Sequence, residues 1–438
     1  MFEFSQAEWS RESWVESAND PVSGFPLQSL PYCVFAGDGG RPRLGVGIGN
    51  LILDLPSCSR SGLFERLPAS IQLATQAQTL NPLMACAADD HAALRSRLMD
   101  LLGAEADPAT RDAVSAALAP AASATLLKPV ESANYTDFYS SIHHAARVGR
   151  LFRPDNPLMP NYKFVPIGYH GRASSIIVSG TPVRRPHGQA KPGEPGGVPS
   201  FGPTRFLDYE VEVALYIANG NPLGEPVGIR QAGSQIFGIS LLNDWSARDI
   251  QSWENQPLGP FLAKSFATSV SPWVVPMAAL APFRVAARSR PAEDPAPLPY
   301  LFDASDQSTG AIDLTVEAWL LTPAMRAAGL APHRLSQANL RDLWWTPAQL
   351  VAHHSSNGCN LLPGDLLATG TVSGEEDSAA GCLLERTAGG KLPITLPNGE
   401  ARTALEDGDE VILRGDCRRE GFPAISLGEC RGLVVPAL

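Results

Sequence analysis

Glycine and proline recur along the whole chain, and their spread restricts the fold more than any other feature of the sequence. Each occurs 39 times in 438 residues. Because both residues interrupt regular backbone hydrogen bonding, the pattern predicts many short elements joined by turns. The sequence contains no internal repeat and no coiled-coil heptad pattern. We therefore expect a mostly β protein with short helices, large enough for two or three domains.

The first 122 residues are expected to form a domain of their own. Three short apolar runs predict strands: Tyr32–Phe35, Leu44–Ile48 and Leu51–Leu55. Gly37–Gly40 predicts the turn between the first two. Residues 66–118 are rich in Ala and Leu at helical spacing, which predicts helices. The small residues 119–124 predict a linker, so we divide the chain into domains of residues 1–122 and 123–438.

The second domain is expected to be larger and richer in β structure. Apolar runs that predict strands are Ile236–Leu242, Gly364–Gly370, Glu410–Leu413 and Gly432–Val435. Thr346 before Pro347 predicts the start of a short helix, because these residues suit the cap and the first helical position. Pro182–Pro203 is dense in proline and glycine and predicts an irregular crossing loop.

Composition limits the partners and the compartment. The net charge of −11 and the pI near 5.3 argue against nucleic acid and anionic membrane surfaces as partners. No run of about 18 apolar residues predicts a membrane helix. The polar, acidic start predicts no signal peptide. Seven dispersed cysteines without a CxxC pair predict reduced thiols in a cytoplasmic protein. The motifs of nucleotide-binding loops, serine hydrolases and zinc proteases are missing.

Closely spaced acidic residues point to a metal site. Glu210 and Glu212 lie two apart in a run of alternating apolar residues, so a strand would place both carboxylates on one face. Asp137 and Asp244 lie in two other polar segments. Burying like charges together is costly, and a divalent cation that prefers oxygen ligands would relieve the repulsion. The alternative is the outward polar face of an edge strand.

Basic and amide side chains near these acids suggest a catalytic site. His144 follows Asp137 by seven residues and suits a general base, although a lone histidine is more often structural. Arg248 and Gln251 would share one face of a helical turn and could stabilise an oxyanion, or could simply belong to a helix start. Lys264 stands alone in an uncharged run, and faces either the acids or, by snorkelling, the solvent.

Taken together, these segments resemble the fumarylacetoacetase family. The motifs that carry the resemblance are Tyr135–Ser141, Gly168–Ser175, Asn243–Ile250, Lys264–Phe266, Ser271–Pro276, His353–Ser355 and Asn357–Asn360, with Phe25–Pro31 and Ile52–Leu55 at the N-terminal end. The resemblance covers most of the chain and is weakest at residues 60–120. It implies a small SH3-like N-terminal barrel, a larger C-terminal β-sandwich or β-roll domain, and a homodimer.

The resemblance also assigns roles to individual residues. It implies a Ca²⁺ or Mg²⁺ site at Asp137, Glu210, Glu212 and Asp244, with a second cation position at Lys264, Ala267 and Thr268. The family usually has glycine where Ala267 stands. His144 would be the general base, oriented by Glu385, while Arg248, Gln251 and Lys264 would stabilise the oxyanion. Further substrate contacts would be Tyr139, Arg153, Tyr169 and Thr371.

The implied reaction is hydrolysis of a carbon–carbon bond in fumarylacetoacetate, a β-diketone with a carboxylate at each end. This reaction is the last step of tyrosine and phenylalanine breakdown. One departure from the family is Asn255, which stands where the family has a tyrosine that contacts substrate. Two other readings stay open: a different enzyme of the wider superfamily, such as an acylpyruvate hydrolase, an oxaloacetate decarboxylase or a hydratase, and a metal-binding protein without catalysis.

Overall fold

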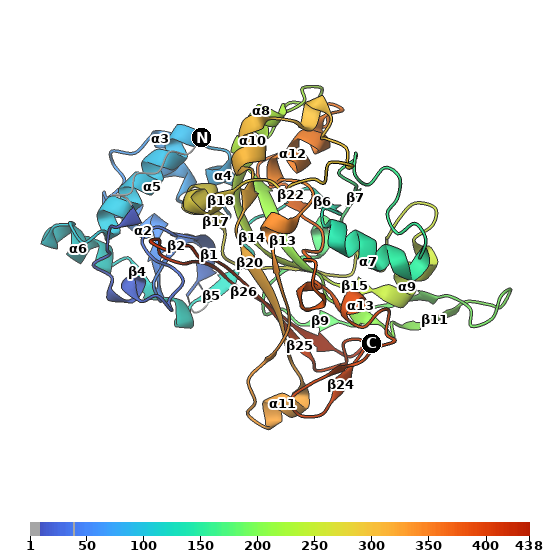
Figure 1. Cartoon of the computed structure of the whole chain (residues 1–438). Helices are drawn as coiled ribbons and strands as arrows, with labels where there is room; N and C mark the ends of the chain where they lie inside the picture. The colour runs from blue at the N-terminus through green and yellow to red at the C-terminus, as the bar shows by residue number, and fades with distance from the viewer. Residues whose placement is uncertain (1–8, 38–39) are drawn as a thin grey trace.

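The computed structural model describes residues 9–37 and 40–438. The predicted turn at Gly37–Gly40 lies partly outside the described residues, as does most of the N-terminal segment for which no signal peptide is expected. Within the described ranges, the chain forms an N-terminal sheet with helices on one side and a larger β-rich region beside it (Figure 1). None of its helices combines the length and the apolar character needed to cross a membrane.

The N-terminal region is built on a five-stranded antiparallel sheet in the order β4-β3-β2-β1-β5. Its strands are β1 (Tyr32–Ala36), β2 (Arg43–Ile48), β3 (Leu51–Asp54), β4 (Leu118–Pro120) and β5 (Thr125–Leu127). Its helices are α2 (Leu55–Arg60), α3 (Ala69–Ala74), α4 (Asn81–Met84), α5 (Ala88–Leu102) and α6 (Pro108–Ser115). These positions confirm the predicted strands and the helical segment. Leu94, Leu98 and Leu102 on α5 are fully buried in the core that this sheet shares with the larger region.

The predicted linker at residues 119–124 is wrong, because this segment belongs to the N-terminal sheet. Ala119 pairs with Ile52 in β3, and β5 then pairs with β1 through Leu127 and Val34. The small side chains of Ala119, Ala121 and Ala124 pack against a buried cluster around Phe35. These alanines thus belong to the N-terminal region, and we propose a domain boundary after Leu127.

The larger region contains two main sheets. The eight-stranded sheet has the order β7-β6-β22-β13-β14-β16-β8, with β17 paired to β14. Its strands are β6 (Tyr135–Phe138), β7 (Gly168–His170), β8 (Ile176–Val178), β13 (Val211–Ile217), β14 (Ile236–Asp244), β16 (Thr268–Val270), β17 (Val275–Pro276) and β22 (Leu366–Ala368). The five-stranded sheet, in the order β21-β20-β25-β26-β9, contains β9 (Val183–Arg184), β20 (Thr315–Leu321), β21 (His333–Asn339), β25 (Glu410–Cys417) and β26 (Ile425–Val435).

Strand β13 is central and divides two hydrophobic cores. All seven of its residues are buried. Val213 and Leu215 belong to the core beneath the five-stranded sheet, whereas Ala214 and Tyr216 belong to the core shared with the N-terminal helices. Gly432 on β26 allows this sheet to approach closely, since a Cβ atom there would lie 2.2 Å from the Trp245 ring. Both faces of the central sheet are thus covered, and a polar residue on β13 is necessarily buried.

Short helices and two-stranded ribbons complete the larger region. The helices are α7 (Ile142–Phe152), α8 (Ile229–Ala232), α9 (Arg248–Glu254), α10 (Ala304–Thr309), α11 (Pro323–Ala327), α12 (Pro347–Ser355) and α13 (Leu383–Arg386). The ribbons are β10 (His187–Ala190) with β11 (Ser200–Pro203), β12 (Leu207–Asp208) with β15 (Ser246–Ala247), β18 (Arg284–Val285) with β19 (Ala311–Ile312), and β23 (Ile394–Thr395) with β24 (Ala401–Arg402). Thr346 caps α12 as predicted.

The prediction of an irregular loop at Pro182–Pro203 is wrong. The segment contains β9 and the hairpin β10–β11, which extends from the body beside α9 (Figure 1). A Cβ atom on Gly188 would lie 2.5 Å from Ile250 of α9, so glycine is needed for close packing there. The fold as a whole is mixed β with helices and curled sheets, as the sequence predicts.

Candidate active site

Four carboxylates meet at one end of the central sheet. One oxygen from each of Asp137, Glu210, Glu212 and Asp244 lies within 4.8 Å of the others. They come from β6, from the start of β13 and from the end of β14. All four side chains are buried, and Glu212 is fully so. An outward-facing edge strand is therefore excluded, and the predicted acidic cluster is present.

Glu210 and Glu212 do not lie in one continuous strand as we expected. The ladder is interrupted between β12 and β13, at Tyr209 and Glu210. There the amide of Glu210 donates to the side chain of Asn243, at 3.1 Å. The carbonyl of Glu210 still accepts from the amide of Asp244, at 3.3 Å, and the two carboxylates reach the same cluster but have different neighbours.

Two buried cations balance Glu210 and Asp244. Lys264 Nζ contacts Glu210 and lies 2.5 Å from Asp244 Oδ2, so its side chain is not snorkelling to solvent. Arg248 lies 2.7 Å from Glu210 and 2.9 Å from Asp208. Burial alone lowers the pKa of Lys264, but the charges of Asp244 and Glu210 raise it overall. Burial likewise raises the pKa of Glu210, but Arg248, Lys264 and His144 lower it overall. Lys264 and Glu210 therefore remain charged, whereas burial and the charge of Glu210 raise the pKa of Asp244 despite Lys264.

Neither Asp137 nor Glu212 has an ion-pair partner in the described part of the chain, and the charge of Lys264 offsets only part of the rise in their pKa. Within residues 9–37 and 40–438, no group donates a hydrogen bond to either oxygen of Glu212 or to Oδ1 of Asp137. Burial raises the pKa of Glu212 well above its usual value, and the charges of Asp137 and Asp244 raise it further. Burial and the charge of Asp244 likewise raise the pKa of Asp137. A divalent cation would supply the missing positive charge, and four carboxylates are the ligand set that Mg²⁺ or Ca²⁺ prefers. The residues present fit such an ion.

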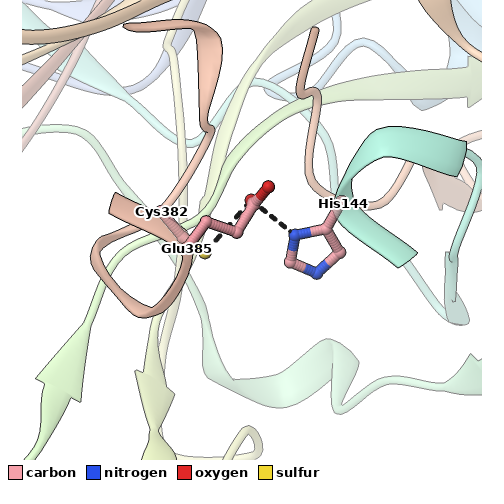
Figure 2. Close-up of side chains that lie close together, drawn as sticks. All are labelled: His144, Cys382 and Glu385. Carbon is pink, nitrogen blue, oxygen red and sulfur yellow. Dashed lines mark hydrogen bonds and ion pairs between the residues drawn. The ribbon is translucent and has the colours of Figure 1, made fainter. Parts of the chain in front are cut away.

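His144 and Glu385 form a buried pair (Figure 2), and His144 lies beside Glu210 of the carboxylate cluster. His144 lies in the first turn of α7, where Ser141 caps its amide, and Glu385 comes from α13. Their Nδ1 and Oε1 atoms are 2.6 Å apart. The other imidazole nitrogen, Nε2, lies 4.0 Å from Glu210 and 3.4 Å from the Thr371 hydroxyl. With Nδ1–H donating to the carboxylate, Nε2 is free to accept a proton at the edge of the acidic cluster.

Several polar groups keep Glu385 ionised. Its Oε1 also accepts from Ser373 at 2.8 Å, and the Cys382 thiol lies 3.3 Å away. Its Oε2 lies 3.3 Å from Arg147. Burial raises the pKa of Glu385, but the charge and hydrogen bond of His144, with Ser373 and Arg147, lower it overall. The carboxylate can thus orient the imidazole and stabilise it when protonated.

Most of the predicted substrate contacts surround this site. The Tyr139 ring stands edge-on to His144, with centroids 5.3 Å apart. Tyr169 donates to Asp244 at 3.0 Å, and Thr268 does so at 3.3 Å. Gln251 accepts from Arg248 at 3.1 Å, so the predicted pair shares one turn of α9.

Arg153 and His143 are placed differently. Arg153 is exposed beyond the end of α7 and donates to the carbonyl of Pro157, at 3.1 Å. Within the described ranges, no contact joins it to the carboxylate cluster or to the His144–Glu385 pair. His143 is half-buried near Arg288 and Asp342, which distinguishes it from its neighbour His144.

The sequence analysis did not identify two residues that bind the catalytic side chains, Asp208 and Arg147. Asp208 is fully buried, pairs with Arg248, and accepts from the amides of Leu383 and Leu384 at the start of α13. Arg147 contacts Glu385 from α7. Asp208 could have been suspected, because it lies in the same acidic run as Glu210. Arg147 had only a weak signal, its position one helical turn after His144.

Comparisons with known proteins identify the family to which the chain belongs. The family model described as fumarylacetoacetate (FAA) hydrolase C-terminal matches residues 133–435, and that described as fumarylacetoacetase N-terminal matches residues 28–129. The chain is 47% identical to the fumarylacetoacetase of Bos taurus, over 97% of this chain and 99% of the bovine protein. It is 46% identical to that of Homo sapiens, over 97% and 99% of the two chains.

A solved structure supports the fold. The fumarylacetoacetate hydrolase from Exiguobacterium antarcticum aligns with a TM-score of 0.51 at 16% identity, over 93% of this chain and 99% of that one. Together, the two family models and the identity along nearly the whole length show that the chain belongs to the fumarylacetoacetase family.

Proposed function

We propose that this chain is a metal-dependent hydrolase that cleaves 4-fumarylacetoacetate into fumarate and acetoacetate. The observation that carries the proposal is the position of His144 Nε2, 4.0 Å from a carboxylate of the four-acid cluster. A general base and a metal site are thus adjacent, as hydrolysis of a β-diketone requires. The relatives named fumarylacetoacetase, at 41–47% identity, support this substrate.

The metal proposal concerns the carboxylate cluster. Asp137, Glu210, Glu212 and Asp244 would hold Ca²⁺ or Mg²⁺, and Lys264 with Thr268 would form the second cation position. When bound, the divalent ion supplies positive charge that polarises the diketone oxygens. Ala267, which is buried and lies between Lys264 and Thr268 in the sequence, contributes no side-chain ligand to that second position.

The remaining chemistry belongs to side chains around the cluster. His144, held by Glu385, takes a proton from water at Nε2, and the resulting hydroxide attacks the carbonyl carbon of the fumaryl group, which is the ketone carbon attached to the carbon–carbon double bond. Arg248, Gln251 and Lys264 stabilise the negative charge on the tetrahedral oxygen. The carbon–carbon bond breaks, fumarate forms, and His144 returns its proton to the departing acetoacetate carbon. Tyr139, Arg153, Tyr169 and Thr371 are the proposed substrate contacts.

The proposal also covers the N-terminal fold, the oligomeric state, the cellular location and the partners of the enzyme. The five-stranded N-terminal sheet is proposed as the SH3-like barrel of the family, and the enzyme as a homodimer. Seven free cysteines, of which only Cys359 is not buried, support a cytoplasmic location. The net charge supports a small-molecule substrate without nucleic-acid or membrane partners.

A turnover assay tests the function. Purified protein is given fumarylacetoacetate, and the loss of diketone absorbance is followed with and without chelator. Acylpyruvate and oxaloacetate serve as comparison substrates for the two rival hydrolase and decarboxylase activities. Faster turnover of either one would favour another enzyme of the superfamily, and metal binding without any turnover would favour a non-catalytic protein.

A further inference from the structure

Arg147 contacts two parts of the proposed active site from one side chain, Glu385 and the segment of residues 374–376. It lies one helical turn after His144 on α7, so both side chains project from the same face of the helix. Its Nη1 atom donates to the carbonyl of Gly374 at 2.8 Å and to Glu385 Oε2 at 3.3 Å. Its Nη2 atom donates to the carbonyls of Glu375 and Glu376. Only about 14% of the side chain is exposed.

These contacts matter because the elements they join are short. The helix α13, which carries Glu385, has four residues, too few to be stable without tertiary contacts. The segment around Gly374 contains no strand, yet it carries Thr371, which faces His144 Nε2, and Ser373, which donates to Glu385. Arg147 links both of these to the longer helix α7.

The charge of Arg147 also acts on the His144–Glu385 pair. Among residues 9–37 and 40–438, Arg147 is the one lysine or arginine in ion-pair contact with Glu385. It binds Oε2, whereas His144 binds Oε1, so the carboxylate is fixed at both oxygens. A planar guanidinium suits the binding of a carboxylate and nearby carbonyls, because its N–H donors point in fixed directions.

We propose that Arg147 is a positioning residue, which fixes Glu385 and the Thr371–Ser373 segment so that His144 Nε2 faces the reacting water. This role rests on the proposed hydrolase function. Misplacing a catalytic group by about 1 Å typically costs a hundredfold in rate. Loss of Arg147 therefore lowers kcat by roughly tenfold to a hundredfold and leaves KM within about twofold, because none of its contacts is with the four-carboxylate cluster.

Three variants test the role. Arg147→Met keeps the apolar stem, Arg147→Lys keeps the charge without the fork of donors, and Arg147→Ala leaves space for added guanidinium. We expect a large fall in kcat for Arg147→Met and an intermediate kcat for Arg147→Lys. For Arg147→Ala, we expect millimolar guanidinium to raise kcat by at least about fivefold. The matched control is Arg150→Met on the same helix, where the side chain is exposed, and kcat stays unchanged.

Two further measurements separate positioning from general destabilisation. Affinity for Ca²⁺ alone, measured by calorimetry, stays within about twofold in Arg147→Met. The short His144–Glu385 bond should give a far-downfield imidazole proton resonance, identified by its absence in His144→Gln, and this resonance broadens or disappears in Arg147→Met. If Arg147→Met does not fold, the Ca²⁺ affinity and the resonance are measured on Arg147→Lys and compared with those of the unsubstituted protein.

The opposing outcomes are distinct. Unchanged kcat and an unchanged resonance in Arg147→Met would overturn the proposal. A parallel fall of kcat, Ca²⁺ affinity and melting temperature, without guanidinium rescue, would overturn it in favour of a purely structural role. If the unsubstituted protein does not hydrolyse fumarylacetoacetate, the proposed function fails, and the resonance alone then decides whether Arg147 orders the pair.

Discussion

Glu212→Gln is the change that best tests the metal site, because it should raise the melting temperature of the metal-free protein and at the same time reduce the further rise that metal produces. Glu212 is fully buried, and no group in the described part of the chain donates to its oxygens. Without metal, glutamine removes an acid that is costly to bury and keeps nearly the same volume. With metal, the same change removes one of four carboxylate ligands.

The expected shifts can be estimated. A ligand present at a hundred times its Kd stabilises a protein by about 2.7 kcal/mol. With about 2 °C per kcal/mol for a large domain, metal should raise the melting temperature by about 5 °C. If the lost carboxylate weakens binding tenfold, about 1.4 kcal/mol of that effect disappears, so the metal-induced rise falls to about 3 °C. Removing an unsatisfied buried acid should raise the metal-free melting temperature by about 2–6 °C, from about 1–3 kcal/mol.

Differential scanning calorimetry of chelator-stripped protein, before and after addition of Ca²⁺ or Mg²⁺, measures both shifts. Glu194→Gln is the matched control, since Glu194 is exposed at the tip of the β10–β11 hairpin and should change neither value. A metal-free Glu212→Gln variant that melts below the unsubstituted protein, with an unchanged metal-induced rise, would refute both the assigned ligand and the reasoning from burial.

Three further predictions concern the catalytic pair and the substrate. His144→Ala should lower kcat by roughly a hundredfold or more, and His143→Ala should have a mild effect; steady-state kinetics giving the reverse ranking would contradict the assigned base. Because the pKa of Glu385 is lowered, its carboxylate stabilises the fold above the usual value of 4.5, and this contribution disappears as the pH falls through the lowered pKa. Denaturant unfolding of Glu385→Gln should therefore depend less on pH below about 4.5, and an equally steep loss of stability would count against the pair. Asn255→Tyr should lower KM by up to about tenfold with kcat nearly unchanged, and a level or higher KM would reject a lost substrate contact at this exposed position.

The sequence predicted those parts of the structure that have a local signal. The strands at Tyr32 and Ile236 and the capped helix at Thr346 follow from short apolar runs or capping residues. The structure of the segments at 119–124 and 182–203 is not predictable in this way, because small residues, glycine and proline are also typical of irregular chain. In the structure a Cβ atom on Gly188 would clash with Ile250, and Ala119 packs against the buried cluster around Phe35.

The site was predictable in its residue types and not in its supporting contacts. Long motifs shared with one family identified the acids and His144. Glu385 lies 241 positions after His144, and Arg147 contacts residues about as far along the chain, so no local pattern links them. Only the folded chain shows that α7, the segment at Ser373 and α13 meet.

Glu210 and Glu212 show why residue spacing alone does not determine chemistry. Two positions apart, they were expected to share one strand face and so one environment. The interruption of the ladder before β13 instead brings Glu210 to Arg248 and Lys264, which lower its pKa against the effect of burial. Glu212 stays in the strand without a cation, and burial with its acidic neighbours raises its pKa. One carboxylate is thus compensated by two cations of the protein itself, whereas the other has no such ion pair in the described part of the chain, although the two lie only two positions apart.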